Sequence, residues 1–98
     1  MTDEVVVTAR AVTDLEEIGE WLLQHNPETA IATVRSLRER CEGLGRSPLQ
    51  GRRIAGRRGV RQIVSGRYLI LYTVEKRRIV IIRIVHGSRD LRSLLEGA

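Results

Sequence analysis

The sequence predicts an α+β fold in which a helical hairpin packs on a small, mainly antiparallel sheet. Its C-terminal half contains runs of β-branched and aliphatic residues, which are typical of strands. Its N-terminal half instead has apolar residues three or four positions apart, which is typical of helices. Because the chain has 98 residues, we expect 1–98 to form a single domain.

Residues 78–86 form the clearest strand, because the run consists almost entirely of Ile and Val. A nearly continuous apolar run predicts a strand that is covered on both faces and is therefore central. Residues 67–74 form a second strand, and the short polar link Glu75–Arg77 predicts an antiparallel hairpin. A third strand, 60–64, is joined through Ser65–Gly66 and completes a three-stranded meander.

Ahead of the meander we expect an edge strand and two helices. Val5–Val7 is a short β-branched run that predicts the strand. The first helix has two candidate N-caps, Thr8 and Thr13, and Thr13 with Glu16 matches a capping box. Its apolar stripe is Val12, Leu15, Ile18 and Leu22.

The second helix begins after Asn26, a favourable cap, with Pro27 at its first position. Its apolar stripe is Ile31, Val34, Leu37, Cys41 and Leu44. Because almost nothing separates the two helices, they should lie antiparallel on the apolar face of the sheet. Residues 47–59, rich in Gly and Arg, predict a loop, and Leu91, Leu94 and Leu95 predict a short C-terminal helix.

The net charge of +5 is unevenly distributed, because seven arginines fall between Arg46 and Arg67. This concentration predicts attraction to a polyanion, either nucleic acid or an acidic protein segment, although a solvated rim is the alternative. Three aromatic residues are too few for a single-strand stacking platform. The single Cys41 excludes an intramolecular disulfide and fits a reducing, cytoplasmic location. No stretch approaches the ~20 apolar residues of a membrane span, and we expect neither metal nor cofactor.

Arg83 is the anomaly of the 78–86 strand, where alternation places it on the face of Ile79, Ile81 and Val85. It should form an ion pair with Asp90 or Glu75, or else bind a partner, because an unpaired buried charge is costly. Of the other candidates, two also have two interpretations each and Arg89 has one. His86 is a hydrogen-bonded structural residue or an acid/base group, Asp90 is a helix cap or a contact residue, and Arg89 is a contact residue.

The aromatic residues also have structural and functional interpretations. Trp21 is expected to be a half-buried anchor under the helical hairpin, or an interface residue. Tyr68 and Tyr72 lie four apart on one face of a strand and should be core residues whose hydroxyls need partners.

Four stretches in order carry a family resemblance: residues 11–18, 47–52, 67–72 and 82–90, the last ending in His-Gly-Ser-Arg-Asp. Together they span nearly the whole chain, which resembles the ParE branch of the RelE/ParE toxins of bacterial type II toxin–antitoxin modules. The resemblance implies a toxin that poisons DNA gyrase by protein–protein contact.

The RelE branch implies a different activity, ribosome-dependent mRNA cleavage. Its members usually have Arg after the Tyr of the middle meander strand, and a Tyr or His in the C-terminal tail. Here Leu69 follows Tyr68, and residues 91–98 contain neither Tyr nor His. An enzyme is therefore disfavoured, since only Arg61, Arg83, Arg89 and His86 could substitute. The alternatives are a RelE-like endoribonuclease using Arg61, Arg83 and His86, or a non-toxic member that only binds its antitoxin.

The resemblance also implies a cognate ParD-like antitoxin with a DNA-binding half and an acidic, disordered C-terminal half, forming a hetero-oligomer with the toxin. DNA would then be bound only through the antitoxin. For the antitoxin we expect contacts from Trp21, Leu22, Arg52, Arg53, Arg61 and Tyr68. For gyrase we expect contacts from Arg83, His86, Arg89, Asp90 and Leu94.

Overall fold

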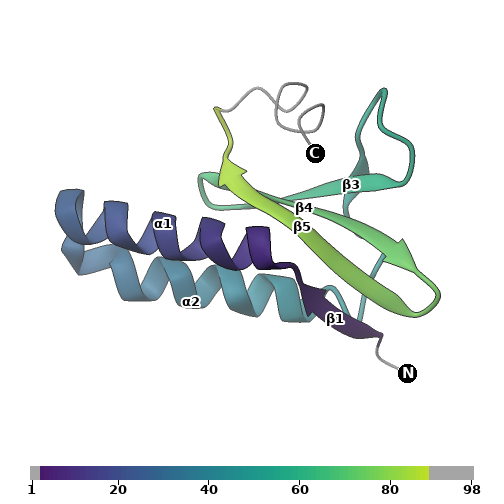
Figure 1. Cartoon of the computed structure of the whole chain (residues 1–98), viewed down its shortest axis with the longest axis horizontal. Helices are drawn as coiled ribbons and strands as arrows, with labels where there is room; N and C mark the ends of the chain where they lie inside the picture. Colours follow the sequence, from purple (N-terminus) through teal and green to yellow (C-terminus); the bar gives the residue numbers. More distant parts are fainter. Residues whose placement is uncertain (1–2, 89–98) are drawn as a thin grey trace.

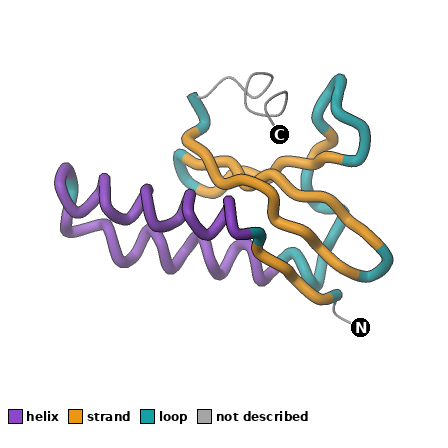
Figure 2. Tube along the Cα trace, in the orientation of Figure 1, coloured by secondary structure: helices purple, strands orange, loops and turns teal. Residues whose placement is uncertain are grey.

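The computed structural model describes residues 3–88, in which two helices pack on one face of a five-stranded sheet (Figures 1 and 2). The elements are β1 (Glu4–Val7), α1 (Ala9–His25), α2 (Pro27–Gly43), β2 (Arg52–Arg53), β3 (Val60–Ser65), β4 (Tyr68–Glu75) and β5 (Arg78–His86). The strand order is β1-β5-β4-β3-β2. Only β1 and β5 pair in parallel. The predicted α+β fold, helical hairpin and C-terminal meander are therefore confirmed.

Thr8 starts α1 and fastens it to the sheet. Its Oγ1 accepts a hydrogen bond from the backbone N–H of Ala11 (3.2 Å) and donates to the carbonyl of Ile81 (2.8 Å). Thr13 lies inside the helix and donates to the carbonyl of Ala9 (3.1 Å). The capping box expected at Thr13 is wrong, because a cap serves the free N–H groups of the first turn.

The tip of the helical hairpin extends beyond the sheet (Figure 1). Asn26 joins the two helices and occupies the predicted N-cap position of α2, but its side chain makes no capping hydrogen bond. Ile31, near this tip, is 70% exposed, so its assignment to the buried stripe is wrong. Val12 is likewise exposed, and the neighbouring Ala11 occupies the core instead.

The main core lies between the helices and the sheet. Its buried residues are Ala11, Leu15, Leu37, Cys41 and Leu44 from the helical half and Ile63, Ile70, Tyr72, Ile79, Ile81 and Ile84 from the strands. Burying one large aliphatic side chain stabilises a fold by roughly 1.5–3 kcal/mol, so this cluster holds the two layers together. A smaller cluster, Val60 and Leu71 with Ile54, Leu69 and Ile82, explains why the strands are also apolar on their other face.

A bulge in β5 changes which of its residues face the helices. Tyr72 pairs with Ile81 while Leu71 pairs with Arg83, so Ile82 has no partner on β4. Ile81 before the bulge and Ile84 after it both join the main core, although strict alternation would separate them. The expectation that Arg83 shares a face with Ile79 and Ile81 is therefore wrong, because the extra residue shifts the alternation by one.

The segment 47–59 is more ordered than the expected loop. It contains β2, in which Arg52 pairs with Gln62 and Arg53 with Arg61. The buried hydroxyl of Tyr72 holds the start of the segment, because it donates to the carbonyl of Pro48 (2.8 Å) and accepts from the N–H of Gly51 (2.9 Å). The helix expected at 91–95 lies outside the described residues.

Candidate functional site

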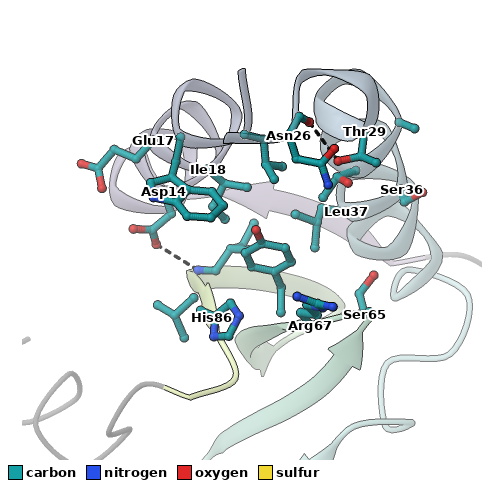
Figure 3. A pocket seen from close by; sticks show the side chains of 18 of the residues that line it. Asp14, Glu17, Ile18, Asn26, Thr29, Ser36, Leu37, Ser65, Arg67 and His86 are labelled. Atoms are coloured by element: carbon teal, nitrogen blue, oxygen red, sulfur yellow. Dashed lines mark hydrogen bonds between the residues drawn. The ribbon is translucent and has the colours of Figure 1, made fainter. Parts of the chain in front are cut away.

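A groove of about 1280 Å³ opens between the helical hairpin and the end of the sheet (Figure 3). We call it the hairpin groove. Its walls are formed by α1, by α2, by the β3–β4 turn and by the end of β5. They include Asp14, Glu17, Ile18, Trp21, Leu22, His25, Thr29, Thr33, Ser36, Leu37, Ser65, Gly66, Arg67, Tyr68, Arg83, Ile84, Val85 and His86. The groove exists because the helices continue past the point where the strands end (Figure 1).

The α1 wall carries an exposed aromatic surface. Trp21 and His25 lie one turn apart, and their rings stack with centroids 4.1 Å apart and planes inclined by 9°. The Nδ1–H of His25 donates to the backbone carbonyl of Trp21 (2.8 Å), which fixes the imidazole. Trp21 is 55% exposed, so it is about half-buried as expected, but its exposed part opens onto the groove and is not covered by the hairpin. The stacked pair instead offers a flat, rigid surface to a partner.

The second feature of the groove is an ion pair between its helical and sheet walls. Arg83 donates to both carboxylate oxygens of Asp14, at 2.9 Å from Nε and 3.1 Å from Nη2. The same carboxylate accepts the backbone N–H of Ile84 (2.9 Å), and Figure 3 shows Asp14 at this wall. The expected ion pair of Arg83 therefore exists, but its partner is Asp14 rather than Glu75, which lies near Arg78. Asp90 lies outside the described residues.

The sheet wall is formed by an aromatic pair and a basic turn. Tyr68 and His86 are register partners on β4 and β5, and their rings meet edge to face at 5.6 Å. Nδ1 of His86 accepts hydrogen bonds from the hydroxyl (2.8 Å) and the N–H (3.2 Å) of Ser88. Arg67 in the adjacent turn is exposed and has no ion pair among residues 3–88. This wall therefore offers a free positive charge beside an aromatic surface.

The groove unites some of the predicted site residues and leaves others apart. It contains Trp21, Leu22 and Tyr68, expected to bind the antitoxin, and Arg83 and His86, expected to contact the target. Arg52, Arg53 and Arg61 lie away from it, on β2 and β3. Arg89, Asp90 and Leu94 lie outside the described residues.

The three residues considered for RNA cleavage do not form one site. Arg83 and His86 line the hairpin groove, whereas Arg61 does not. The guanidinium of Arg61 donates to the backbone carbonyls of Gly51 (2.8 Å) and Leu49 (3.4 Å). All catalytic groups must reach the same scissile phosphodiester, and Arg61 is separated from Arg83 and His86.

Four ionisable groove residues were not predicted as site residues from the sequence: Asp14, Glu17, His25 and Arg67. Asp14 could have been found, because it falls three positions after Ala11 and four before Ile18, on the buried face of α1. A carboxylate in an apolar stripe predicts a buried basic partner. The other three carried no comparable signal, since polar residues at solvent-facing positions are common.

The groove also lies where the charge of the molecule changes sign. Residues 3–43 contain nine carboxylates and four arginines, whereas residues 44–88 contain eleven basic side chains and one carboxylate, Glu75. Within 3–88, no three potential metal-ligating side chains come together. Neither of the two helices within residues 3–88 is long and apolar enough to cross a bilayer.

The model of a protein family described as "ParE toxin of type II toxin-antitoxin system, parDE" matches residues 5–91. Among solved structures, the chain is similar to one from the chromosomal ParDE toxin–antitoxin system of P. aeruginosa, at 22% identity and a TM-score of 0.77, covering 87% of this chain and 96% of that one. It is also similar to a chain of the RelBE2 toxin–antitoxin complex of Mycobacterium tuberculosis, at 24% identity and a TM-score of 0.58, covering 88% and 99%. At these identities the two structures demonstrate a shared fold. No curated protein sequence matches the chain.

Proposed function

Because the chain belongs to the ParE toxin family of type II toxin–antitoxin systems, we propose that it inhibits DNA gyrase by protein–protein contact and is neutralised by a ParD-like antitoxin. The observation that carries the proposal is the hairpin groove, an open aromatic and apolar channel with a basic wall. Such a channel suits a segment that folds as it binds, since ordering is offset by contacts along its whole length.

The antitoxin segment that fits the groove is amphipathic and acidic. Its apolar side would cover Trp21 and Tyr68, and large aromatic residues of this kind supply most of the binding energy in protein interfaces. Its carboxylates would face Arg67 and the basic sheet half, and avoid the carboxylates of α1. This antitoxin would come from the same operon and act within the cytoplasm.

A toxin that acts by contact is favoured over one that cleaves RNA. The guanidinium of Arg83 is occupied by Asp14, and that of Arg61 by two backbone carbonyls. Both groups would have to leave these partners before they could stabilise a phosphorane. The exposed residues of the groove, by contrast, can bind a protein surface without rearrangement.

The activity is tested by expressing the full chain without antitoxin and assaying it on purified gyrase and on ribosomes carrying mRNA. We expect DNA cleaved by gyrase to accumulate while the mRNA stays intact. Cleaved mRNA, with the cleavage lost in His86→Ala or Arg61→Ala, would contradict the proposal. Normal growth with no effect in either assay would identify the chain as a member that only binds its antitoxin.

Binding in the groove is tested through Trp21, the only tryptophan in the chain. The probe is a tryptophan-free peptide from the C-terminal part of the protein encoded by the adjacent reading frame. It should change the fluorescence of Trp21, and Trp21→Ala should weaken binding by at least about tenfold in calorimetry. Leu23→Ala is the matched control, since Leu23 is an equally exposed α1 residue (59%) outside this groove. A larger effect at Leu23 would place the antitoxin on the other side of α1.

A further inference from the structure

Residues 52–61, here called the arginine hairpin, project a structured tip from the sheet edge (Figure 1). The tip consists of two consecutive turns, closed by hydrogen bonds from Arg57 N to Ile54 O (3.2 Å) and from Val60 N to Arg57 O (3.3 Å). Gly56 (φ +79°) and Gly59 (φ +81°) occupy the third position of each turn. A type II turn requires this backbone conformation, which favours glycine. The sequence Ile-Ala-Gly-Arg-Arg-Gly-Val therefore encodes a defined tip that presents Arg57 and Arg58.

Four arginines of this hairpin have charges that no carboxylate of the described residues neutralises. Within residues 3–88, none of Arg52, Arg53, Arg57 and Arg58 forms an ion pair. Arg53 lies directly opposite Arg61, and like charges at paired strand positions destabilise a sheet. The hydrogen bonds of Arg61 to carbonyls leave its positive charge in place beside Arg53. The fold tolerates this repulsion without any compensating carboxylate in the described part, which indicates that a polyanion supplies the compensation.

The directions of the arginines favour a duplex over an acidic peptide. Arg52 and Arg53 are consecutive on a strand and therefore point to opposite faces, while Arg57 and Arg58 lie at the tip. An extended peptide on one face would meet only some of them. A groove of duplex DNA has a row of phosphates on each side, and the major groove, about 12 Å wide, admits a two-stranded ribbon. The hairpin contains no aromatic residue, so base stacking with a single strand is not available to it.

We propose that the arginine hairpin binds the phosphate backbone of duplex DNA without sequence preference. Each guanidinium can donate two hydrogen bonds to one phosphate. The site is separate from the hairpin groove, because the tip adjoins Val60 at one end of β3 and the groove includes Ser65 at the other. The protein would thus contact DNA directly, in addition to any contact made through an antitoxin. This inference does not rest on gyrase inhibition.

The test measures the affinity of the full chain for a short mixed-sequence DNA duplex by fluorescence anisotropy over a series of salt concentrations. The variant Arg52→Gln/Arg57→Gln/Arg58→Gln removes three hairpin charges. The control Arg35→Gln/Arg38→Gln/Arg40→Gln removes three exposed charges from α2. We expect the hairpin variant to reduce the slope of log K against log salt by about 2.7, with a loss of at least about tenfold in affinity at low salt, and the control to bind within about twofold of the wild type. Circular dichroism verifies that both variants are folded.

Three results would overturn the inference. Equal losses in the two triple variants would mean that only net charge matters. Absence of duplex binding by the wild-type chain at low salt would remove the site. Tighter binding of a poly-glutamate peptide than of the duplex, lost in the hairpin variant, would make the hairpin a docking surface for acidic protein segments.

Discussion

Asp14 and Arg83 join α1 to β5 across 69 positions of sequence, through a bidentate ion pair whose side chains are 4% and 12% exposed. β1 pairs with β5 only as far as Ile81, and beyond that point the Asp14 carboxylate accepts the N–H of Ile84. The Asp14 side chain therefore neutralises the nearly buried charge of Arg83. It also accepts the backbone N–H of Ile84, for which β1 offers no pairing partner. It also closes the inner wall of the hairpin groove.

Removing this carboxylate should destabilise the fold strongly. We expect Asp14→Ala to lower the free energy of unfolding by about 3–5 kcal/mol, because it leaves the Arg83 charge buried without a partner. Urea denaturation measures the change. Arg10→Ala is the control, since Arg10 lies 3.7 Å from Asp14 but is half-exposed, and it should cost less than about 1 kcal/mol. Equal effects of the two substitutions would contradict the structural role of the pair.

The two tyrosines of β4 should respond differently to loss of the hydroxyl. Tyr72→Phe leaves the carbonyl of Pro48 and the N–H of Gly51 without their buried partner, which should cost about 1–3 kcal/mol. The hydroxyl of Tyr68 makes no hydrogen bond within residues 3–88, so Tyr68→Phe should change stability by less than about 0.5 kcal/mol. Thermal unfolding of the two variants side by side gives the comparison. If Tyr72→Phe unfolds at the wild-type temperature, the hydroxyl is not holding residues 48–51.

The β4–β5 turn carries backbone strain that substitution should relieve. Lys76 (φ +30°) and Arg77 (φ +65°) both have positive φ, as the central residues of a type I′ turn do, where Asn-Gly is preferred. Lys76→Asn/Arg77→Gly should raise the free energy of unfolding by about 1 kcal/mol and the Tm by about 4–8 °C. The contact of Arg77 with Asp3 (3.9 Å) is lost as well, but the arginine is largely exposed and the loss is small. Lys76→Ala/Arg77→Ala, which keeps the strain, should give no stabilisation. A fall in Tm for the Asn-Gly variant would show that the turn is not strained.

Cys41 should make stability depend on pH in alkaline solution. Burial, and secondarily the charge of Glu42, raises the pKa of the Cys41 thiol from 9.0 to about 11. The unfolded chain therefore releases this proton at lower pH than the folded one, and the free energy of unfolding falls between about pH 9 and pH 11. The fall amounts to at most about 3 kcal/mol. Cys41→Ala should lose this part of the pH dependence, as measured by urea denaturation across that range. Parallel profiles for the two proteins would contradict the shift.

Local patterns in the chain were sufficient to predict most of the secondary structure. The Ile/Val run became β5 with the predicted bounds, Arg78–His86, and the helical spacing of the first half became α1 and α2. Errors arose where a single residue had two acceptable roles. Thr8 and Thr13 were both plausible caps. The helix begins directly after β1, so the free N–H groups of its first turn lie beside Thr8, and Thr8 is the cap.

The candidate site was predicted in part, and the reason lies in the bulge at Ile82. Nothing in a run of Ile and Val marks one residue as unpaired, yet this residue determines the face of every side chain after it. The partner of Arg83 was sought at Asp90 or Glu75, whereas it is Asp14 on α1. The exposure of Trp21 to the groove could not be predicted. It depends on how far the helices extend past the strands, and no local pattern encodes that distance.

The amino-acid sequence by itself determined the order and type of the two helices and of every described strand except β2, together with the meander and the concentration of positive charge, because periodicity and composition act over a few neighbouring residues. Only the tertiary structure decided that Asp14 meets Arg83, that the groove opens beside Trp21, and that Arg61 is turned toward backbone carbonyls. These contacts link residues that are far apart in the chain, and they depend on register, on one unpaired residue and on the relative lengths of helices and strands.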